Sequence, residues 1–253
     1  MIMNSMDMYC FADYHTHTQY SHGTGTVRDN VAAAAARGLE VVAISDHGPN
    51  HLFGIGIEGL HILEKIRSEL IEVRSEFPMV QGLVGIEANI ISTAGDLDLP
   101  PEKAHLVDVL QANIHALVRP KTLKDGVRIY VNHYGGKLFH SLHQRSRLIN
   151  TEAVINAVYR NRIHIITHPG LRFNIDTRAL ARACQERGTY LEINTSHDHM
   201  TPEFLEIAAG EGAKFVIGSD AHSPERVGDF AKGLALARQV GLSVDQIVNA
   251  RVD

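Results

Sequence analysis

The feature that most constrains the fold is a regular alternation of short apolar runs with amphipathic stretches. The apolar runs predict strands at Phe11–His15, Val41–Ser45, Val80–Ile86, Val107–Ile114, Ile163–Thr167, Tyr190–Ile193 and Phe215–Gly218. Continuous apolar runs such as Val41–Ser45 are typical of strands that are buried on both faces. Strand–helix alternation of this kind favours a parallel sheet with right-handed crossovers.

The stretches between these runs predict helices at Val27–Arg37, Leu60–Phe77, Thr151–Asn161, Thr177–Arg187, Pro202–Glu211, Pro224–Val240 and Val244–Ala250. Residues 116–150 show no regular pattern, so no structure is predicted there. The expected fold is one α/β domain over residues 1–253, closed or nearly closed into a barrel. An open doubly wound sheet is the alternative, because periodicity does not distinguish the two.

Composition narrows the class of protein. A net charge of −5 over 253 residues gives no broad basic surface for nucleic acid, although a nucleotide could still bind through a metal site. Cys10 and Cys184 are the only cysteines, which is typical of reduced thiols in a cytoplasmic protein. Residues 1–7 do not resemble a signal peptide, and no apolar run approaches the ~20 residues that span a bilayer. We therefore expect a cytoplasmic protein without a membrane partner.

The first predicted strand ends in a His-x-His pair, His15 and His17, and His22 lies on the loop that follows. Alternate side chains of a strand share one face, so both imidazoles could bind the same cation. Asp13 would lie on that face as well, where its carboxylate could orient a ring by accepting the second N–H.

Other predicted strands also end in a histidine or an acid. These residues are His47, Glu87, His115, His168, Asp220 and His222. In parallel α/β folds the carboxyl ends of the strands carry the active site. Imidazoles and carboxylates without thiolates suit zinc, manganese or iron(II). Seven histidines and two carboxylates are too many for one ion, so two or three ions are expected.

The strand-end motifs occur in an order that resembles the PHP family, named for polymerase and histidinol phosphatase. They are Asp13–His17, Ser21–Gly23, Ser45–His47, Gly85–Glu87, Ile114–His115, Thr167–Pro169 and Ser219–His222. The chain looks most like the stand-alone PHP hydrolases rather than the PHP domains of DNA polymerases. This resemblance implies a distorted seven-stranded (β/α) barrel, similar to a TIM barrel, with a trinuclear centre of Zn, Mn or Fe ions.

The resemblance also implies how the ligands divide among three divalent ions. One ion would be held by His15, His17, Glu87 and Asp220. A second would be held by Glu87, which bridges, with His115 and His168. The third would be held by His22, His47 and His222.

The expected activity is that of a metal-dependent phosphoric ester hydrolase. The leading interpretation is a histidinol-phosphatase-like enzyme that hydrolyses a small phosphate monoester with a metal-bound hydroxide, with Glu87 and Asp220 at its catalytic centre. His197 is the candidate general acid and His199 a candidate substrate contact. Arg172 and Arg226 are candidate phosphate clamps.

Several alternatives remain open at this point. They are a phosphodiesterase or 3′–5′ exonuclease acting on nucleotides or DNA, a phosphotyrosine phosphatase, an amide hydrolase on a similar barrel, and a non-catalytic metal-binding module. The Gly-x-Gly-x-x-Gly sequence at 54–59 is interpreted as a rim loop, because it does not directly follow a strand. His51 and three other histidines have no partner pattern and are interpreted as surface or core residues. The sequence makes no prediction of the oligomeric state.

Overall fold

The computed structural model describes residues 8–136 and 140–252; the segment in which no signal peptide was expected, residues 1–7, lies outside this range. The central element is a seven-stranded sheet formed by β2 (Ala12–Thr16), β3 (Val41–Ile44), β4 (Gln81–Asn89), β5 (Val109–Asn113), β6 (Ile165–Ile166), β7 (Tyr190–Asn194) and β8 (Phe215–Gly218). Neighbouring strands are parallel and pair in chain order. The predicted parallel α/β sheet is confirmed.

The two edge strands of this sheet approach each other and nearly close it into a barrel. Thr16, at the end of β2, forms a parallel bridge with Ala221, just beyond β8. The backbone N–H of His17 donates to the carbonyl of Ala221 over 2.8 Å, and the N–H of Ala221 donates to the carbonyl of His15 over 3.2 Å. These contacts confirm the distorted seven-stranded barrel, and the open doubly wound alternative is wrong.

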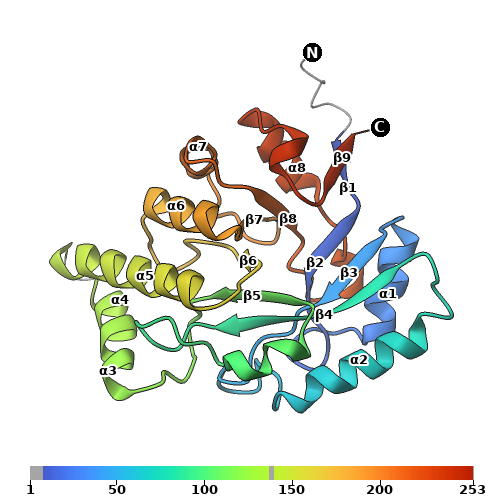
Figure 1. The fold of residues 1–253 in the computed structure, drawn as a ribbon, viewed down its shortest axis with the longest axis horizontal. Coiled ribbons are helices and arrows are strands. Elements are labelled where there is room, and N and C mark those ends of the chain that lie inside the picture. Colours follow the sequence, from blue (N-terminus) through green and yellow to red (C-terminus); the bar gives the residue numbers. More distant parts are fainter. Residues whose placement is uncertain (1–7, 137–139, 253) are drawn as a thin grey trace.

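Six helices of nine residues or more run along the outside of the curved sheet in the part of the chain that the structure describes (Figure 1). They are α1 (Val27–Ala36), α2 (His61–Val73), α5 (His140–Arg160), α6 (Thr177–Arg187), α7 (Pro202–Gly210) and α8 (Ala231–Gln239). Thr26 and Asp29 form a capping box at the start of α1, and Asp176 caps α6, as expected for helices with defined starts. Within the described residues, no helix is both long and apolar enough to cross a membrane.

The barrel interior is apolar at one end and polar at the other. Ala43, Val109, Ile165 and Val216 form a small buried cluster. Because successive side chains of a strand alternate between faces, the interior face continues along β4 and β5 to Glu87 and Gln111, which are paired in register and both 0% exposed. Buried polar groups at the carboxyl ends of the strands mark that end as the site of any chemistry.

Two of the predicted helices near the C-terminus are wrong in part. Pro224–Val240 contains a 3-10 turn, η4 (Pro224–Arg226), and α8 only begins at Ala231, because Gly228 between them has a φ of +76° that no right-handed helix accommodates. In Val244–Ala250 there is only a 3-10 turn, η5 (Val244–Gln246). The chain then forms β9 (Ala250–Val252), which pairs antiparallel with β1 (Met8–Cys10) outside the barrel (Figure 1).

Residues 116–150, for which no structure was predicted, are largely helical. After η2 (Pro101–Leu106) and β5, the chain forms α3 (Leu123–Gly126), a π-helical turn η3 (Val127–Val131) and α4 (Asn132–Gly135), and α5 already begins at His140. Leu123, Val127 and Val131 are all exposed. Since these apolar side chains mark no buried face, the sequence shows no amphipathic period there.

Candidate metal centre

The nine residues predicted as metal ligands lie at the carboxyl end of the barrel. They come from β2, β4 and the loops after β2, β3, β5, β6 and β8: His15, His17, His22, His47, Glu87, His115, His168, Asp220 and His222. Six of them line a cavity of ≈ 290 Å³. The other three, His15, His17 and Glu87, are at most 1% exposed. The structure therefore brings all nine predicted positions to one place.

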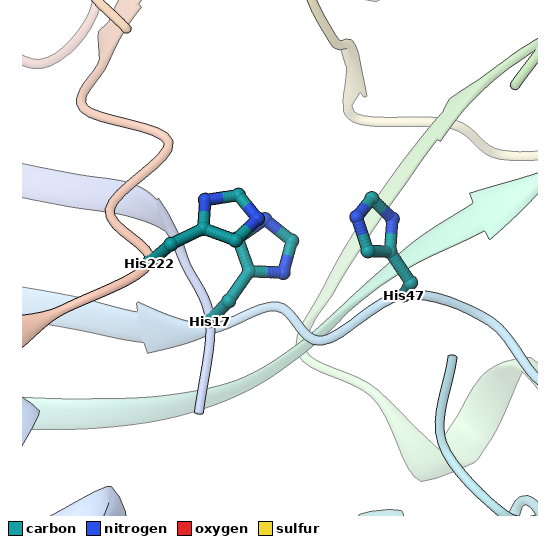
Figure 2. Close-up of side chains that lie close together, drawn as sticks. All are labelled: His17, His47 and His222. Carbon is teal, nitrogen blue, oxygen red and sulfur yellow. The ribbon is translucent and has the colours of Figure 1, made fainter. Parts of the chain in front are cut away.

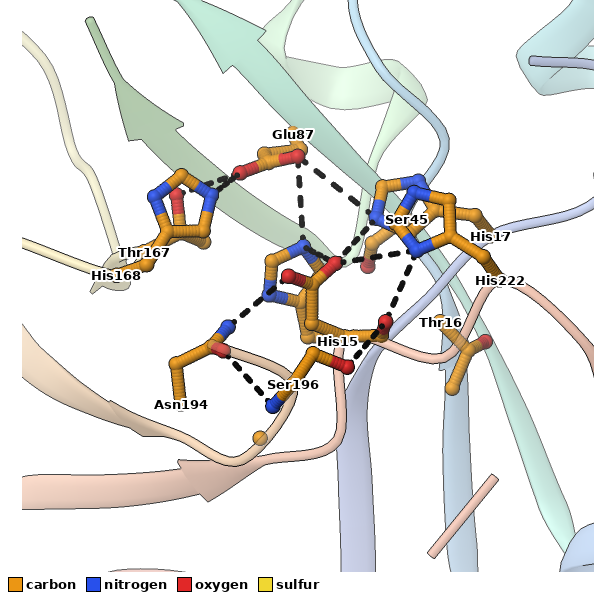
Figure 3. Close-up of polar contacts among 12 residues, drawn as sticks. His15, Thr16, His17, Ser45, Glu87, Thr167, His168, Asn194, Ser196 and His222 are labelled. Atoms are coloured by element: carbon orange, nitrogen blue, oxygen red, sulfur yellow. Dashed lines mark hydrogen bonds and ion pairs between the residues drawn. The ribbon is translucent and has the colours of Figure 1, made fainter. Parts of the chain in front are cut away.

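Glu87 contacts imidazoles from several segments of the chain, and Figure 3 shows its links to His15, His17 and His168. Its Oε1 is 2.8 Å from His168 Nε2 and 3.0 Å from His115 Nε2. Its Oε2 is 2.7 Å from His47 Nδ1 and 3.4 Å from His15 Nε2. Burial opposes ionisation of this carboxyl, but the imidazoles around it, His115 first, hold its pKa well below the usual range. A carboxylate whose two oxygens face different imidazoles is suited to bridge two cations.

Asp220 is the second acid of the group. Its Oδ1 lies 3.2 Å from His17 Nε2 and 3.6 Å from His15 Nε2. Burial again opposes ionisation, and His15 and His17 hold the pKa of Asp220 well below its usual range. Asp220 has a φ of +50°, in the left-handed region that residues with a side chain seldom adopt. Such strain is found where the surrounding structure holds a functional side chain in place.

A third group consists of imidazoles alone (Figure 2). His17, His47 and His222 each offer a nitrogen within 4.8 Å of the others. The resemblance placed His22 here rather than His17. The ring centroid of His22 lies 4.2 Å from that of His222 and 5.0 Å from that of His47, so His22 borders this group.

Three further triplets bring their ligand atoms within 4.8 Å of one another. They are His15–His17–Glu87, His15–His168–Asp220 and Glu87–His115–His168. The last is the set that the resemblance assigns to the second ion, and the first contains three of the four ligands assigned to the first ion. The remaining triplet joins His15 and Asp220 of the first set to His168 of the second. Which residues hold which ion stays a prediction.

The donor atoms of this centre fit divalent transition ions. Several buried atoms form no well-aligned hydrogen bond, although some lie close to another member of the group: His15 Nε2, both ring nitrogens of His17, His47 Nδ1, His222 Nε2 and Glu87 Oε2. Buried polar atoms normally have hydrogen-bond partners, so the concentration of these atoms at one place indicates a cation as their common partner. Burial, and then His222, lower the pKa of His17 well below its ordinary value, which keeps its ring neutral as a ligand must be.

Glu192, in β7, lies behind these ligands and is 0% exposed. Its Oε1 accepts a hydrogen bond from His15 Nδ1 over 2.6 Å. Its Oε2 accepts the backbone N–H of His168 over 2.7 Å and the Asn194 amide over 3.0 Å. Asn194 also donates to Asp220 Oδ2 over 3.1 Å. An Nδ1–H of His15 that donates to Glu192 would leave the Nε2 lone pair for a metal ion, the usual arrangement of a metal-bound imidazole.

The expectation that Asp13 orients a ring is wrong. Its carboxylate accepts backbone N–H groups instead, from Gly228 over 2.8 Å and from Ser219 and His15 over 3.3 Å each. Sequence reasoning missed Glu192, although a signal was present. A lone acid between Leu191 and Ile193 in an apolar strand is seldom buried without a partner.

His51 is the other residue that sequence reasoning missed. Its ring centroid lies 4.8 Å from that of His47 and 5.5 Å from that of His115, and its side chain lines the same cavity. No local pattern in the sequence marks it, because its position depends on how the loop after β3 folds.

The four residues predicted to act on substrate lie in different places. His197 lines the cavity, with Nε2 3.3 Å from Asp220 Oδ2, and Arg172 lines it too. His199 lines a neighbouring cavity of ≈ 600 Å³ instead. Arg226 lines neither; its guanidinium donates to Ser196 and lies 3.4 Å from Asp229.

The sequence profile of the PHP domain matches residues 13–196. Among curated proteins, the chain is 31% identical over 257 residues to a "Probable phosphatase" of Acetivibrio thermocellus, covering 95% of this chain and 91% of the relative. It is 29% identical over 251 residues to a "Probable phosphatase" of Aeromonas hydrophila, covering 93% and 88%.

Among solved structures, the chain is similar to histidinol phosphate phosphatase from Lactococcus lactis, crystallised with zinc, L-histidinol and phosphate. The TM-score is 0.65 at 20% identity, with 92% of each chain covered. At this level of identity the likeness shows a shared fold over nearly the whole length of both chains.

Proposed function

The chain belongs to the PHP domain family, and from that premise we propose that it is a metal-dependent phosphatase acting on a small phosphate monoester of the histidinol phosphate type. The observation that carries the proposal is the convergence of two buried acids and seven histidines at the carboxyl end of the barrel, where six of these residues line one cavity. The two "Probable phosphatase" relatives, and the Lactococcus lactis relative crystallised with L-histidinol and phosphate, support this class of substrate.

Three bound divalent ions of Zn, Mn or Fe would supply positive charge for the phosphate oxygens and lower the pKa of a bound water. The side chains of the site would hold these ions. Glu87 and Asp220 would provide negative charge that balances the charge of the ions, and the imidazoles would fill the remaining ligand positions. Glu192 and Asn194 orient three of the ligands by hydrogen bonds from behind. This arrangement presents a preorganised site to a charged ester.

The shape and charge of the site support a small substrate. A cavity of ≈ 290 Å³ is just below the roughly 300–1,000 Å³ typical of ligand pockets. The chain has a net charge of −5, whereas proteins that bind nucleic acid present basic surfaces. Both observations favour a phosphorylated metabolite over a phosphodiesterase or exonuclease acting on a DNA strand.

Two residues on the cavity wall complete the proposal. Arg172 lines the cavity, and it is the proposed phosphate contact because its planar guanidinium could bind two oxygens at once. His197 is the proposed donor of a proton to the leaving group, because its side chain lines the cavity and is 41% exposed while its Nε2 lies beside Asp220. His199 and Arg226 are further from this cavity and contribute less directly.

A non-catalytic metal-binding module is the alternative from a different class. Such a module would have no need for His197, a partly exposed histidine that lines the cavity beside Asp220. A Glu87 in the bridging position also argues against an amide hydrolase of the kind that bridges its ions with a modified lysine.

The test combines elemental analysis with a substrate panel. Purified protein is assayed for bound transition metals, then for hydrolysis of histidinol phosphate, a phosphotyrosine peptide, p-nitrophenyl phosphate and bis-p-nitrophenyl phosphate, with and without chelator. We expect more than one ion per chain, and monoester hydrolysis that chelator abolishes. Glu87→Gln should lose both, and Glu72→Gln, at an exposed position of α2, should keep both. Metal-bound wild type that cleaves only the diester, or no ester, contradicts the proposal.

A further inference from the structure

We propose that His51 is an additional metal ligand of this chain, which together with His47 and His115 holds a divalent transition ion at the cavity wall. The proposal rests on the metal centre described above and adds a residue that neither the motif pattern nor the comparisons assign. It predicts that the chain binds metal through ten side chains rather than nine.

The three rings are arranged as ligands of one ion would be. Each of His47, His51 and His115 offers a nitrogen within 4.8 Å of the other two. The ring centroids of His47 and His115 lie 5.2 Å apart, so the triplet is compact. Nδ1 of His51 is buried and has no hydrogen-bond partner. A histidine placed only for packing would be expected to satisfy that nitrogen.

His51 is held beside His115 by the backbone. It forms an antiparallel bridge with Val118, on the segment that follows His115. The N–H of Leu52 donates to the carbonyl of Leu117 over 2.8 Å, and the N–H of Arg119 donates to the carbonyl of Asn50 over 2.9 Å. The segment that carries His51 is thus paired on both sides of the residue.

The same loop is fixed at its two ends. The N–H of Gly48 donates to the carbonyl of Glu87 over 2.9 Å, and the N–H of Ile57 donates to the carbonyl of His47 over 2.9 Å. A Cβ at Gly56 would lie 2.0 Å from the carbonyl oxygen of Gly48, so the loop closes against itself. Gly56 of the Gly-x-Gly-x-x-Gly sequence therefore permits the close approach that closes the loop carrying His51.

The chemistry of the triplet suits a transition ion. Three imidazoles with an open fourth position are a known zinc arrangement. His115 Nδ1 lies 2.8 Å from Asn89 Oδ1, which accepts its proton and leaves Nε2 as the ligand atom. His47 and His115 lie 2.7 and 3.0 Å from the Glu87 carboxylate. An ion held by the triplet would therefore border Glu87 and the cavity that receives the substrate.

The first test compares His51→Ala with His61→Ala, a histidine that is exposed at the start of α2. Bound zinc and manganese per chain are measured by elemental analysis after dialysis, and affinities by isothermal titration calorimetry. We expect His51→Ala to weaken one ion by at least roughly 10-fold, the lower limit for loss of even an outer-shell partner. His61→Ala should match wild type.

The second test uses a spectroscopic signature of the ligand itself. His51→Cys is loaded with cobalt(II), and a thiolate-to-cobalt charge-transfer band in the near ultraviolet is expected. The two native cysteines give a low background, because both are buried and burial raises the pKa of the Cys10 thiol to about 12 and that of Cys184 further still. His61→Cys is the matched control and should show no such band.

The outcomes separate this proposal from the proposed function. Wild-type metal content and affinity in His51→Ala, with no charge-transfer band in His51→Cys, would overturn the role of His51 while the phosphatase proposal stands. Unchanged metal binding with lost hydrolysis in His51→Ala would likewise overturn it, since His51 would then act on substrate. A wild-type chain that binds no transition ion would overturn both.

Discussion

Replacing Glu192 by glutamine is the sharpest test of how the metal centre is held together. Three donors converge on its two oxygens: His15 Nδ1 at 2.6 Å, the backbone N–H of His168 at 2.7 Å and the Asn194 amide at 3.0 Å. Glutamine has nearly the same shape but only one acceptor oxygen. In Glu192→Gln the amide N–H₂ therefore replaces one of the two carboxylate oxygens and faces a group that previously donated to that oxygen.

The His15 ring is the group with the most to lose. If the amide N–H₂ faces it, Nδ1 must become the acceptor and the proton moves to Nε2, the atom that faces Glu87 and Asp220. A protonated Nε2 is no ligand. Loss of such an outer-shell partner weakens metal binding by roughly 10–100-fold, which is about 1.4–2.8 kcal/mol at tenfold per 1.4 kcal/mol. If the amide N–H₂ faces His168 instead, the backbone N–H of His168 loses its acceptor, which costs about 1–3 kcal/mol of stability.

The assay measures both quantities on one preparation. Zinc or manganese affinity is followed by titration calorimetry, and the free energy of unfolding of the metal-free protein by urea denaturation. Glu72→Gln, on the exposed face of α2, is the matched control and should change neither. If Glu192→Gln binds every ion as tightly as wild type and unfolds at the same urea concentration, the orienting role of Glu192 is refuted.

Three further predictions follow from the same structure. In Gly218→Ala the new Cβ would lie 2.0 Å from Glu192 Oε1, so the carboxylate must move; metal affinity measured by calorimetry should fall as in Glu192→Gln, and an unchanged affinity would contradict this packing. Leu63→Ala, at a 0% exposed position in α2, should lower the free energy of unfolding by about 2–5 kcal/mol in urea denaturation while elemental analysis finds wild-type metal content; a loss of metal would show that helix packing and the centre are coupled. Removing metal with a chelator should lower the melting temperature measured by calorimetry, because each site filled at 100 times its Kd adds about 2.7 kcal/mol, or roughly 5–11 °C at 2–4 °C per kcal/mol. Equal melting temperatures with and without metal would argue that the ions do not bind the folded chain.

The parts of the site that sequence could predict are those set by strand ends. His15, Glu87 and His168 occur at the end of apolar runs, and parallel strands place such positions at one edge whatever the rest of the chain does. The extent of an apolar run and the identity of its last residue can both be read from a short stretch of sequence. For that reason the barrel and the meeting of the nine predicted residues followed from the order of the motifs.

The parts that sequence could not predict depend on contacts between distant segments. The partner of His15 is Glu192, 177 positions away, and nothing near either residue identifies the pair. His51 owes its place to hydrogen bonds between its loop and residues 117–119. The helices between β5 and α5 were not predicted because Leu123, Val127 and Val131 are exposed, so the sequence shows no amphipathic period there.

The central claim, that these side chains jointly bind several cations, is tested most directly by anomalous diffraction. Crystals of the wild-type protein grown with zinc or manganese are measured above and below the absorption edge of the metal. Anomalous peaks about 2.0–2.2 Å from ligand nitrogens and oxygens on both sides of the Glu87 carboxylate would agree with the account. A map with no peak beside Glu87, Asp220 or their imidazoles, at metal concentrations that saturate the protein, would contradict it.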